Sequence, residues 1–396
     1  MNRFFIIMAS IAISVASCTK SGLLEAPDTY ADAISFEPYL GKVPVTKAVN
    51  SDLAFLKTGH NNGANSGGFQ VYSFMHGANN VDPTTFTSPY MAEEVWWSTS
   101  TSTWDYNNVT YWPEDRALSF VAFGLNASKG GCLELQDKTS QTPDLTKYTF
   151  TVKDKVSEQV DLIVAPYQTG LEATETSSNV NLQFKHLLSR IGFSVMSTAA
   201  SSAVDIAIRS ITLHGAFFTN AKVDLTALND SSLPYVTDKS GRQTVYSLFD
   251  SATQCFTIGS DECNTATGSP IYYNTNIVGQ EPGDWEDIYS PLTYTGDANA
   301  IATAKAADVN KRYMMLLPCD MPDDPDDAYI EVRYQLTSDI VRSAKVSLAG
   351  FSFAAGNSYE FILKVSTSSI DFDATMNTDW SDASTNSEVY PLTPIR

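Results

Sequence analysis

Few residues of this 396-residue chain have the types and spacing that catalysis requires. The four histidines stand in no nucleophile–base or metal-binding motif; they are His60, His76, His186 and His214. The sequence also has no phosphate-binding Gly-x-x-x-x-Gly-Lys-Ser/Thr loop and no Gly-x-Ser-x-Gly elbow. We therefore predict a protein that is not an enzyme and that carries no cofactor.

The densest group of carboxylates is formed by Asp323, Asp324, Asp326 and Asp327. Oxygen-rich loops of this kind bind calcium in many proteins, but the spacing here differs from that of a calcium-binding EF-hand loop. We interpret the segment as an acidic turn before a strand at 330–336, and we predict no metal site.

An aromatic-rich block lies between residues 96 and 112. Its tryptophans are Trp96, Trp97, Trp104 and Trp112. Exposed rings of this kind stack on sugars, so these four are candidate glycan contacts, whereas buried rings would fill a β-sandwich core. Strand alternation would place Trp104 and Tyr106 on one face. Both interpretations stay open, and core packing is the simpler one.

The first residues have the pattern of a bacterial lipoprotein leader. Arg3 gives a positive start, and Phe4 to Val15 is an uncharged apolar run too short to span a membrane. Two small residues then precede Cys18. We predict that residues 1–17 are removed, that Cys18 is acylated, and that 18–29 is a tether. The protein would then be an outer-membrane lipoprotein at the cell surface; the alternative is an ordinary secretory signal that is cut nearby.

Four further cysteines follow, Cys132, Cys255, Cys263 and Cys319. An exported protein meets an oxidising compartment, which permits disulfides. Cys255 and Cys263 lie close enough in sequence to staple one loop, but four free or buried thiols fit equally well. The pairing stays open.

The charge balance excludes one class of partner. The chain has 25 Lys and Arg against 45 Asp and Glu, a formal net charge of −20. Phosphate backbones would be repelled by such a surface, so we predict no nucleic-acid binding.

Short runs of period-two alternation dominate the chain and indicate β-strands with one buried and one exposed face. The clearest runs are 69–74, 118–123, 148–152, 161–165, 180–184, 191–195, 330–336 and 359–365. The run 118–123 is almost wholly apolar, which is typical of a central buried strand. The sequence therefore predicts an all-β fold built as β-sandwiches.

The length favours two domains in tandem. A polar, small-residue stretch at 168–179 separates two strongly patterned strands, so we predict β-sandwich domains at 30–174 and 175–396. Within the second domain, 255–309 is rich in Gly, Asn, Thr and Asp and is predicted to be a long insertion. Residues 381–396 form a C-terminal tail.

An ordered set of segments gives the chain a family resemblance. After Cys18 come Val45-Thr46-Lys47-Ala48, Tyr111-Trp112-Pro113 with Leu118 to Phe123, Leu182 to Ile191, Ile208 to Gly215, and Gly356-Asn357-Ser358-Tyr359. In this order the segments resemble the fimbrillins of Bacteroidales, the Mfa-like subunits of type V pili. The resemblance covers nearly the whole chain after the leader.

The resemblance implies two transthyretin-like, Greek-key β-sandwich domains and a structural role in a fimbrium, as stalk, anchor or tip. Polymerising relatives lose their first strand to an Arg-specific protease, and the next subunit donates a strand into the open groove. Here the corresponding position is Lys47, with Lys42 as a second candidate processing site, and the first Arg after Cys18 is Arg116. A Lys-tolerant protease, or no cleavage, fits this departure.

The candidate donor strand lies in the C-terminal tail, and its candidate residues are Val389, Tyr390, Leu392 and Ile395. Its prolines cannot donate backbone hydrogen bonds, which weakens a strand there without excluding it. The expected partners are other fimbrial subunits, the outer membrane through the lipid anchor, and surface glycans or proteins. The alternative function is a surface lipoprotein that binds glycans without polymerising.

Overall fold

The computed structural model contains the whole chain, and a defined set of its residues is described below. These are 33–40, 56–57, 67–77, 83–172, 179–197, 206–227, 236–247, 256–258, 271–273, 286–287, 313–336, 341–365, 370–377, 388–391 and 394–395. Within them, helix is confined to α1 (Leu125–Lys129) and a single 3-10 turn, Val156–Glu158. The all-β prediction is confirmed, and no helix of this part is long and apolar enough to cross a membrane.

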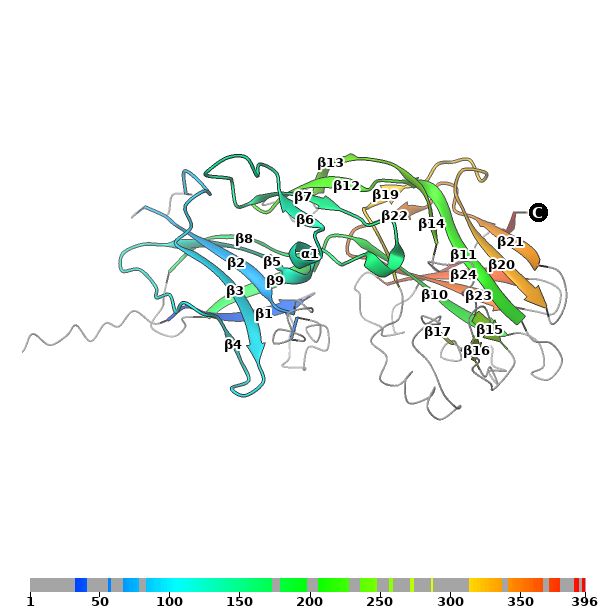
Figure 1. The fold of residues 1–396 in the computed structure, drawn as a ribbon, viewed down its shortest axis with the longest axis horizontal. Coiled ribbons are helices and arrows are strands. Elements are labelled where there is room, and N and C mark those ends of the chain that lie inside the picture. The colour runs from blue at the N-terminus through cyan, green and yellow to red at the C-terminus, as the bar shows by residue number, and fades with distance from the viewer. Residues whose placement is uncertain are drawn as a thin grey trace, which may run out of the picture.

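Seven strands form the first sheet (Figure 1). In spatial order they are β1 (Ser35–Leu40), β9 (Asn179–His186), β8 (Ile163–Leu171), β5 (Leu118–Gly124), β2 (Phe69–Met75), β3 (Met91–Ser98) and β4 (Thr103–Asp105). β1 runs parallel to β9, while the other pairs are antiparallel. β1 is therefore an edge strand of this sheet.

The first sheet has a hydrophobic core on each face, and β5 shows how the sequence builds both. Phe120 and Ala122 belong to one cluster, whereas Val121 and Phe123 belong to the other. Because successive side chains of a strand point to opposite faces, a run buried along its whole length must pack on both sides. The prediction of a central buried strand is confirmed.

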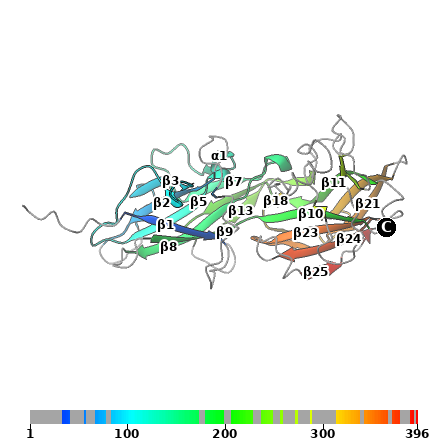
Figure 2. The same ribbon diagram turned by 90° about the horizontal axis from the view of Figure 1, so that it is seen from below.

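Two sheets pack face to face in the second half of the chain (Figure 2). One contains β17 (Glu286–Asp287), β10 (Ser189–Ser197), β23 (Ser358–Val365), β24 (Ile370–Asn377) and β25 (Glu388–Pro391), with β18 (Met314–Leu316) also on β10. The other contains β16 (Ile271–Tyr273), β15 (Phe256–Ile258), β11 (Ile206–Phe217), β20 (Tyr329–Leu336), β21 (Val341–Ser347) and β26 (Pro394–Ile395), with β14 (Gln243–Ser247) on β11. Their inner side chains share one core cluster, as a sandwich requires.

A fourth sheet, of four strands, joins the two halves. Its order is β13 (Val236–Ser240), β12 (Asn220–Asp224), β7 (Lys147–Thr151) and β6 (Leu133–Leu135). β12 pairs antiparallel with β7 along five residues, although the two strands come from different halves of the sequence. One core cluster runs from Phe123 under this sheet to Phe361 in the second half. The halves are thus connected by backbone pairing as well as by apolar packing.

The change from the first sheet to the sandwich lies later in the chain than the predicted 174/175 boundary. β9 pairs with β8 and β1 in the first sheet, and β10 begins the sandwich only at Ser189. The polar stretch at 168–179, which suggested the boundary, instead falls where β8 leads to β9, and these two strands are neighbours in the first sheet. Of the predicted insertion at 255–309, only β15, β16 and β17 lie within the described residues. A two-stranded pair, β19 (Cys319–Asp320) with β22 (Ser352–Phe353), completes the described strands.

Candidate functional site

The strand β1 lies at the edge of the first sheet, where its backbone is bonded on one side by β9. Its Phe36 side chain packs against Phe69, Tyr106 and Phe120, which together form what we term the groove. The parallel register runs from Ser35 opposite Asn179 to Leu40 opposite Phe184. The Ser35 hydroxyl also donates to the side-chain oxygen of Asn179. This pairing follows the backbone, so it would accept other extended segments of suitable side-chain alternation.

Alternate side chains of β1 fill the groove. Ile34 is 1% exposed, Phe36 is 6% exposed and Pro38 is buried, while Glu37 between them is exposed. The groove is aromatic around Phe36, whose ring meets other rings edge-on; the centroid distances are 5.9 Å to Phe69, 5.8 Å to Tyr106 and 6.4 Å to Phe120. Edge-on aromatic pairs add to the stabilisation that burial gives.

The segment 106–111 holds β1 on the side away from β9. The backbone N–H of Ile34 donates to the carbonyl of Thr110 at 2.9 Å, and the Tyr106 hydroxyl donates to the Ile34 carbonyl at 2.6 Å. Ala33 forms an isolated antiparallel bridge with Tyr111. The edge strand is therefore bonded on both sides at its start, and β1 closes the first sheet over its aromatic core.

Loss of β1 would remove both backbone pairing and apolar packing from this edge of the first sheet. If β1 leaves, β9 loses a row of backbone partners and the side chains around Phe36 lose their packing. Burial of a large apolar side chain contributes about 1.5–3 kcal/mol, so vacating Ile34 and Phe36 is a large loss for one domain. Such an edge favours a replacement strand.

The candidate processing sites, Lys42 and Lys47, lie outside the described residues, as does Cys18. The next described residues on the chain are Leu56, which is 1% exposed in the same core as Phe36, and Lys57, whose ammonium lies 3.8 Å from the centre of the Trp97 ring. A chain cut after Lys47 would keep this attachment, because both residues follow the cut.

The C-terminal tail pairs with its own sandwich. In β25, Val389 lies opposite Thr375 and Tyr390 opposite Ala374, while in β26 Ile395 lies opposite Lys345. Leu392, the fourth candidate donor residue, lies outside the described residues. The two strands lie at the outer edges of the two sheets, on β24 and on β21.

The four candidate glycan-contact tryptophans differ in burial. Trp112 is 4% exposed and packs on Phe120 at 5.9 Å, so its ring belongs to the core and the candidate glycan role does not fit it. Trp104 packs on the same core, 5.4 Å from both Phe69 and Trp97. Trp104 and Tyr106 lie on one face, as alternation predicted. Trp96 is partly exposed, opposite Asp105 in the β3–β4 pair.

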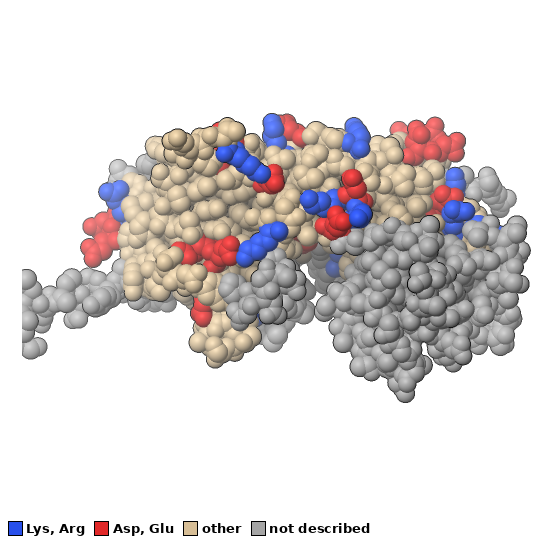
Figure 3. Space-filling model, in the orientation of Figure 1, with Lys and Arg blue, Asp and Glu red and all other residues tan. Residues whose placement is uncertain are grey.

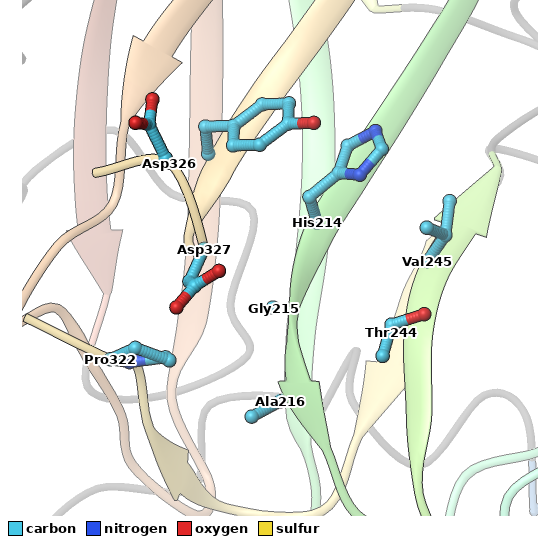
Figure 4. Close-up of a pocket in the computed structure, with 9 residues that line it drawn as sticks. His214, Gly215, Ala216, Thr244, Val245, Pro322, Asp326 and Asp327 are labelled. Atoms are coloured by element: carbon cyan, nitrogen blue, oxygen red, sulfur yellow. The ribbon is translucent and has the colours of Figure 1, made fainter. Parts of the chain in front are cut away.

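A shallow pocket of about 320 Å³ opens in the second half, between β11, β14 and the acidic turn before β20 (Figure 4). The His214 ring stacks on Tyr329 at 4.2 Å, with its Nε2 3.1 Å from the Thr212 hydroxyl and 3.8 Å from a Glu331 carboxylate oxygen. Burial lowers the pKa of His214, against an opposing effect of Glu331. Asp326 and Asp327 line one side, as Figure 4 shows.

The His214 and Tyr329 rings beside this pocket are engaged in contacts within the fold. No group of three His, Cys, Asp or Glu residues among those described could hold a metal ion. Both faces of the Tyr329 ring are covered, because Lys345 lies 4.3 Å from its centre and His214 stacks on it. One carboxylate of the acidic turn bonds within the turn itself, because the Asp324 carboxylate accepts the Asp326 backbone N–H at 2.9 Å.

The remaining reactive side chains are structural where the structure describes them. His186 Nδ1 lies 2.6 Å from an Asp161 oxygen, next to the change of sheet. Cys132 and Cys319 are free and buried; burial raises the pKa of both thiols, to about 12 for Cys319. Cys255 and Cys263 lie outside the described residues.

Charged side chains on the face drawn in Figure 3 are scattered and of both signs. Among the described residues, exposed ion pairs include Lys129 with Glu94 at 2.9 Å and Lys222 with Asp238 at 2.7 Å. The described part of this face therefore carries no continuous basic surface of the kind that phosphate backbones require.

Sequence reasoning missed the contacts around Ile34. The alternation of Trp104 and Tyr106 indicated a shared inward face, but no sequence signal pairs Tyr106 with a carbonyl 72 positions earlier. The stacking of His214 on Tyr329 was missed for the same reason, because the two residues meet only through the pairing of β11 with β20.

The chain matches one protein family and is similar to solved structures. The fimbrillin-like family matches residues 57–380. Among solved structures, the chain is similar to a fimbrial protein from Bacteroides vulgatus, with 16% identity, a TM-score of 0.54, and coverage of 88% of this chain and 99% of that one. It is also similar to a fimbrial assembly protein from Parabacteroides distasonis, with 12% identity, a TM-score of 0.33, and coverage of 82% and 90%. No curated protein matches the chain. The first of these likenesses shows a shared fold.

Proposed function

Because the chain belongs to the fimbrillin-like family, we propose that it is a subunit of a cell-surface fimbria that assembles by β-strand complementation. Family membership makes it a structural protein rather than an enzyme. The observation that carries the assembly mechanism is β1, an edge strand near the start of the chain whose side chains fill an aromatic groove. Cleavage at Lys47, or at Lys42, would detach this strand while Leu56 and Lys57 hold the new start of the chain.

The tail supports a donor role through its alternation. At the first strand the buried positions are Ile34, just before β1, and Phe36 and Pro38 within it, each two residues apart. Tyr390, Leu392 and Pro394 have the same spacing, with proline again third. A tail in this register would place Tyr390 at the Ile34 position and Leu392 beside the rings of the groove. Period-two spacing is what a strand needs to direct one row of side chains inward.

The tail must leave its own domain before it can enter another subunit. β25 contributes four residues and β26 only two to their sheets. Such short edge strands are among the least stable parts of a fold, and their release leaves the central strands paired. Release from β24 and β21 is therefore a small step compared with loss of β1.

Attachment to the cell follows from the leader. We propose that Cys18 carries the lipid and that the uncleaved chain is an outer-membrane lipoprotein. Cleavage after Lys47 would separate the body from this anchor, so uncleaved copies would serve at the base of a fimbria or as accessory subunits. The partners are other fimbrial subunits, joined tail to groove.

The glycan-binding alternative has less support. Two of its four tryptophans pack in the core around Phe120 and Phe69, and Lys57 covers one face of Trp97. Trp96 is then the remaining candidate. A glycan array that responds to Trp96→Ala in the folded protein would restore the alternative.

The test is limited digestion of the lipid-free chain with a Lys-specific protease, followed by N-terminal sequencing and electrophoresis without boiling. We expect a first product that starts at Ala48 and then forms a ladder of heat-sensitive multimers. The matched control carries Lys42→Gln and Lys47→Gln, which leave the described core untouched. Multimers in the uncut control would contradict the proposal. So would a cut product that stays monomeric and does not bind a peptide of residues 388–396.

A further inference from the structure

Both backbone groups of Ile34 bond to one short segment. Its N–H donates to the Thr110 carbonyl at 2.9 Å, and its carbonyl accepts the Tyr106 hydroxyl at 2.6 Å. Ile34 is 1% exposed, so its backbone is poorly placed to bond to water instead. The Tyr106 ring also meets Phe36 edge-on, at 5.8 Å and 68°. The Tyr106 side chain therefore contacts this segment twice: its hydroxyl bonds to the Ile34 backbone carbonyl, and its ring packs on Phe36.

We propose that Tyr106 is the positioning residue that retains a strand in this groove, and that it binds the strand by its backbone carbonyl. Every extended segment presents such a carbonyl whatever its sequence. Tyr106 would therefore hold the chain's own first strand and a tail donated by a second copy in the same way. This inference rests on the proposed function, and it adds the residue that decides how long a donated strand stays.

The surroundings keep the Tyr106 hydroxyl a donor. Burial raises its pKa above the ordinary tyrosine value, and Glu93 adds to the effect. The hydroxyl therefore stays protonated through the neutral range. The same hydroxyl lies 3.4 Å from the Thr110 carbonyl, which also accepts the Ile34 N–H.

Tyr90 provides a matched control. Its hydroxyl donates to the carbonyl of Tyr111 at 2.7 Å, in the same segment, but it makes no bond to β1. Tyr90→Phe removes a hydroxyl of the same kind that steadies the segment itself. Tyr106→Phe removes the one that reaches the strand and keeps the ring that contacts Phe36. A difference between the two variants isolates strand retention from general loosening.

The experiment uses the chain with a sequence-specific protease site in place of residues 42–47. After cleavage and removal of β1, a fluorescent peptide of residues 33–40 and one of residues 388–396 are bound, and their dissociation rates are measured. We expect both peptides to leave Tyr106→Phe about five to ten times faster, since a buried hydrogen bond contributes about one factor of ten. Tyr90→Phe should stay within about twofold of the parent.

A second measurement separates retention from folding. In the empty, cleaved protein the Ile34 carbonyl has left and the Tyr106 hydroxyl keeps only its 3.4 Å contacts with Thr110, so Tyr106→Phe should lower the melting temperature much less than it does in the chain that keeps β1. Equal dissociation rates for Tyr106→Phe and its parent would overturn the inference while leaving the proposed function standing, and so would equal losses in the two variants. If the 33–40 peptide binds and the 388–396 peptide does not, the donor role of the tail is wrong. The dissociation rate of the 33–40 peptide then decides the role of Tyr106 by itself. A groove that takes neither peptide would overturn both.

Discussion

The strands near the two ends of the described chain both lie at sheet edges, yet they are held very differently. β1 packs Phe36 against three aromatic rings, is paired along six residues with β9, and follows Ile34, which bonds to Tyr106 and Thr110. β25 and β26 are four and two residues long and pair along one side only. The difference teaches that position at an edge does not decide how firmly a strand is held. The longer register with β9 and the bonds of Ile34 to the segment 106–111 distinguish the first strand from the two short strands near the C-terminus.

The largest expected effect comes from emptying the pocket of β1. Phe36→Ala removes a ring that is 6% exposed and contacts three other rings, and we expect a loss of about 3–5 kcal/mol in the free energy of unfolding. Denaturant unfolding of the uncleaved chain measures it. Glu37→Ala, on the exposed face of the same strand, should change stability by less than about 0.5 kcal/mol. Similar losses for both variants would mean that β1 is held by its backbone alone.

Removal of the tail should cost much less. Deleting residues 388–396 takes away two short edge strands, and we expect a loss below about 2 kcal/mol with both cores intact. The deleted chain should still accept a 388–396 peptide after cleavage, but should not form multimers by itself. A loss as large as that of Phe36→Ala would remove the asymmetry between the two edges, and with it the case for a tail that is released easily.

The sequence predicted the strands well where burial has a period. β5 was recognisable as a central strand because its apolar run faces two cores, and β20 because Ile330, Val332 and Tyr334 alternate toward one. The predicted domain boundary at 174/175 does not coincide with the change of sheet, because composition marks loops without saying which sheet the next strand joins. β9 follows a polar loop, yet it continues the first sheet.

The candidate site was predictable only in part, for a related reason. The first strand and the processing lysines come from local pattern and resemblance, which a sequence carries. The hydrogen bond from Tyr106 to Ile34 depends on the first sheet curling until its two edges meet. That curl is set by pairing among all seven strands. Trp112 illustrates the same limit, because an aromatic block has one composition whether its rings face water or a core.

The smallest effect concerns pH and distinguishes the two halves. Burial lowers the pKa of His214 in the folded chain, so the unfolded chain binds this proton more readily. The contribution of His214 to stability is therefore complete above its ordinary pKa of about 6.5 and is lost as the pH falls below it. Unfolding measured at about pH 7.5 and about pH 5.5 should show this loss in the parent and a smaller one in His214→Gln. The groove of β1 has no histidine in contact with its strand among the described residues, so dissociation of the 33–40 peptide should not change over the same range. If the parent and His214→Gln lose stability equally between these two pH values, other groups cause the acid sensitivity of the fold. His214 would then not distinguish the second half of the chain from the first.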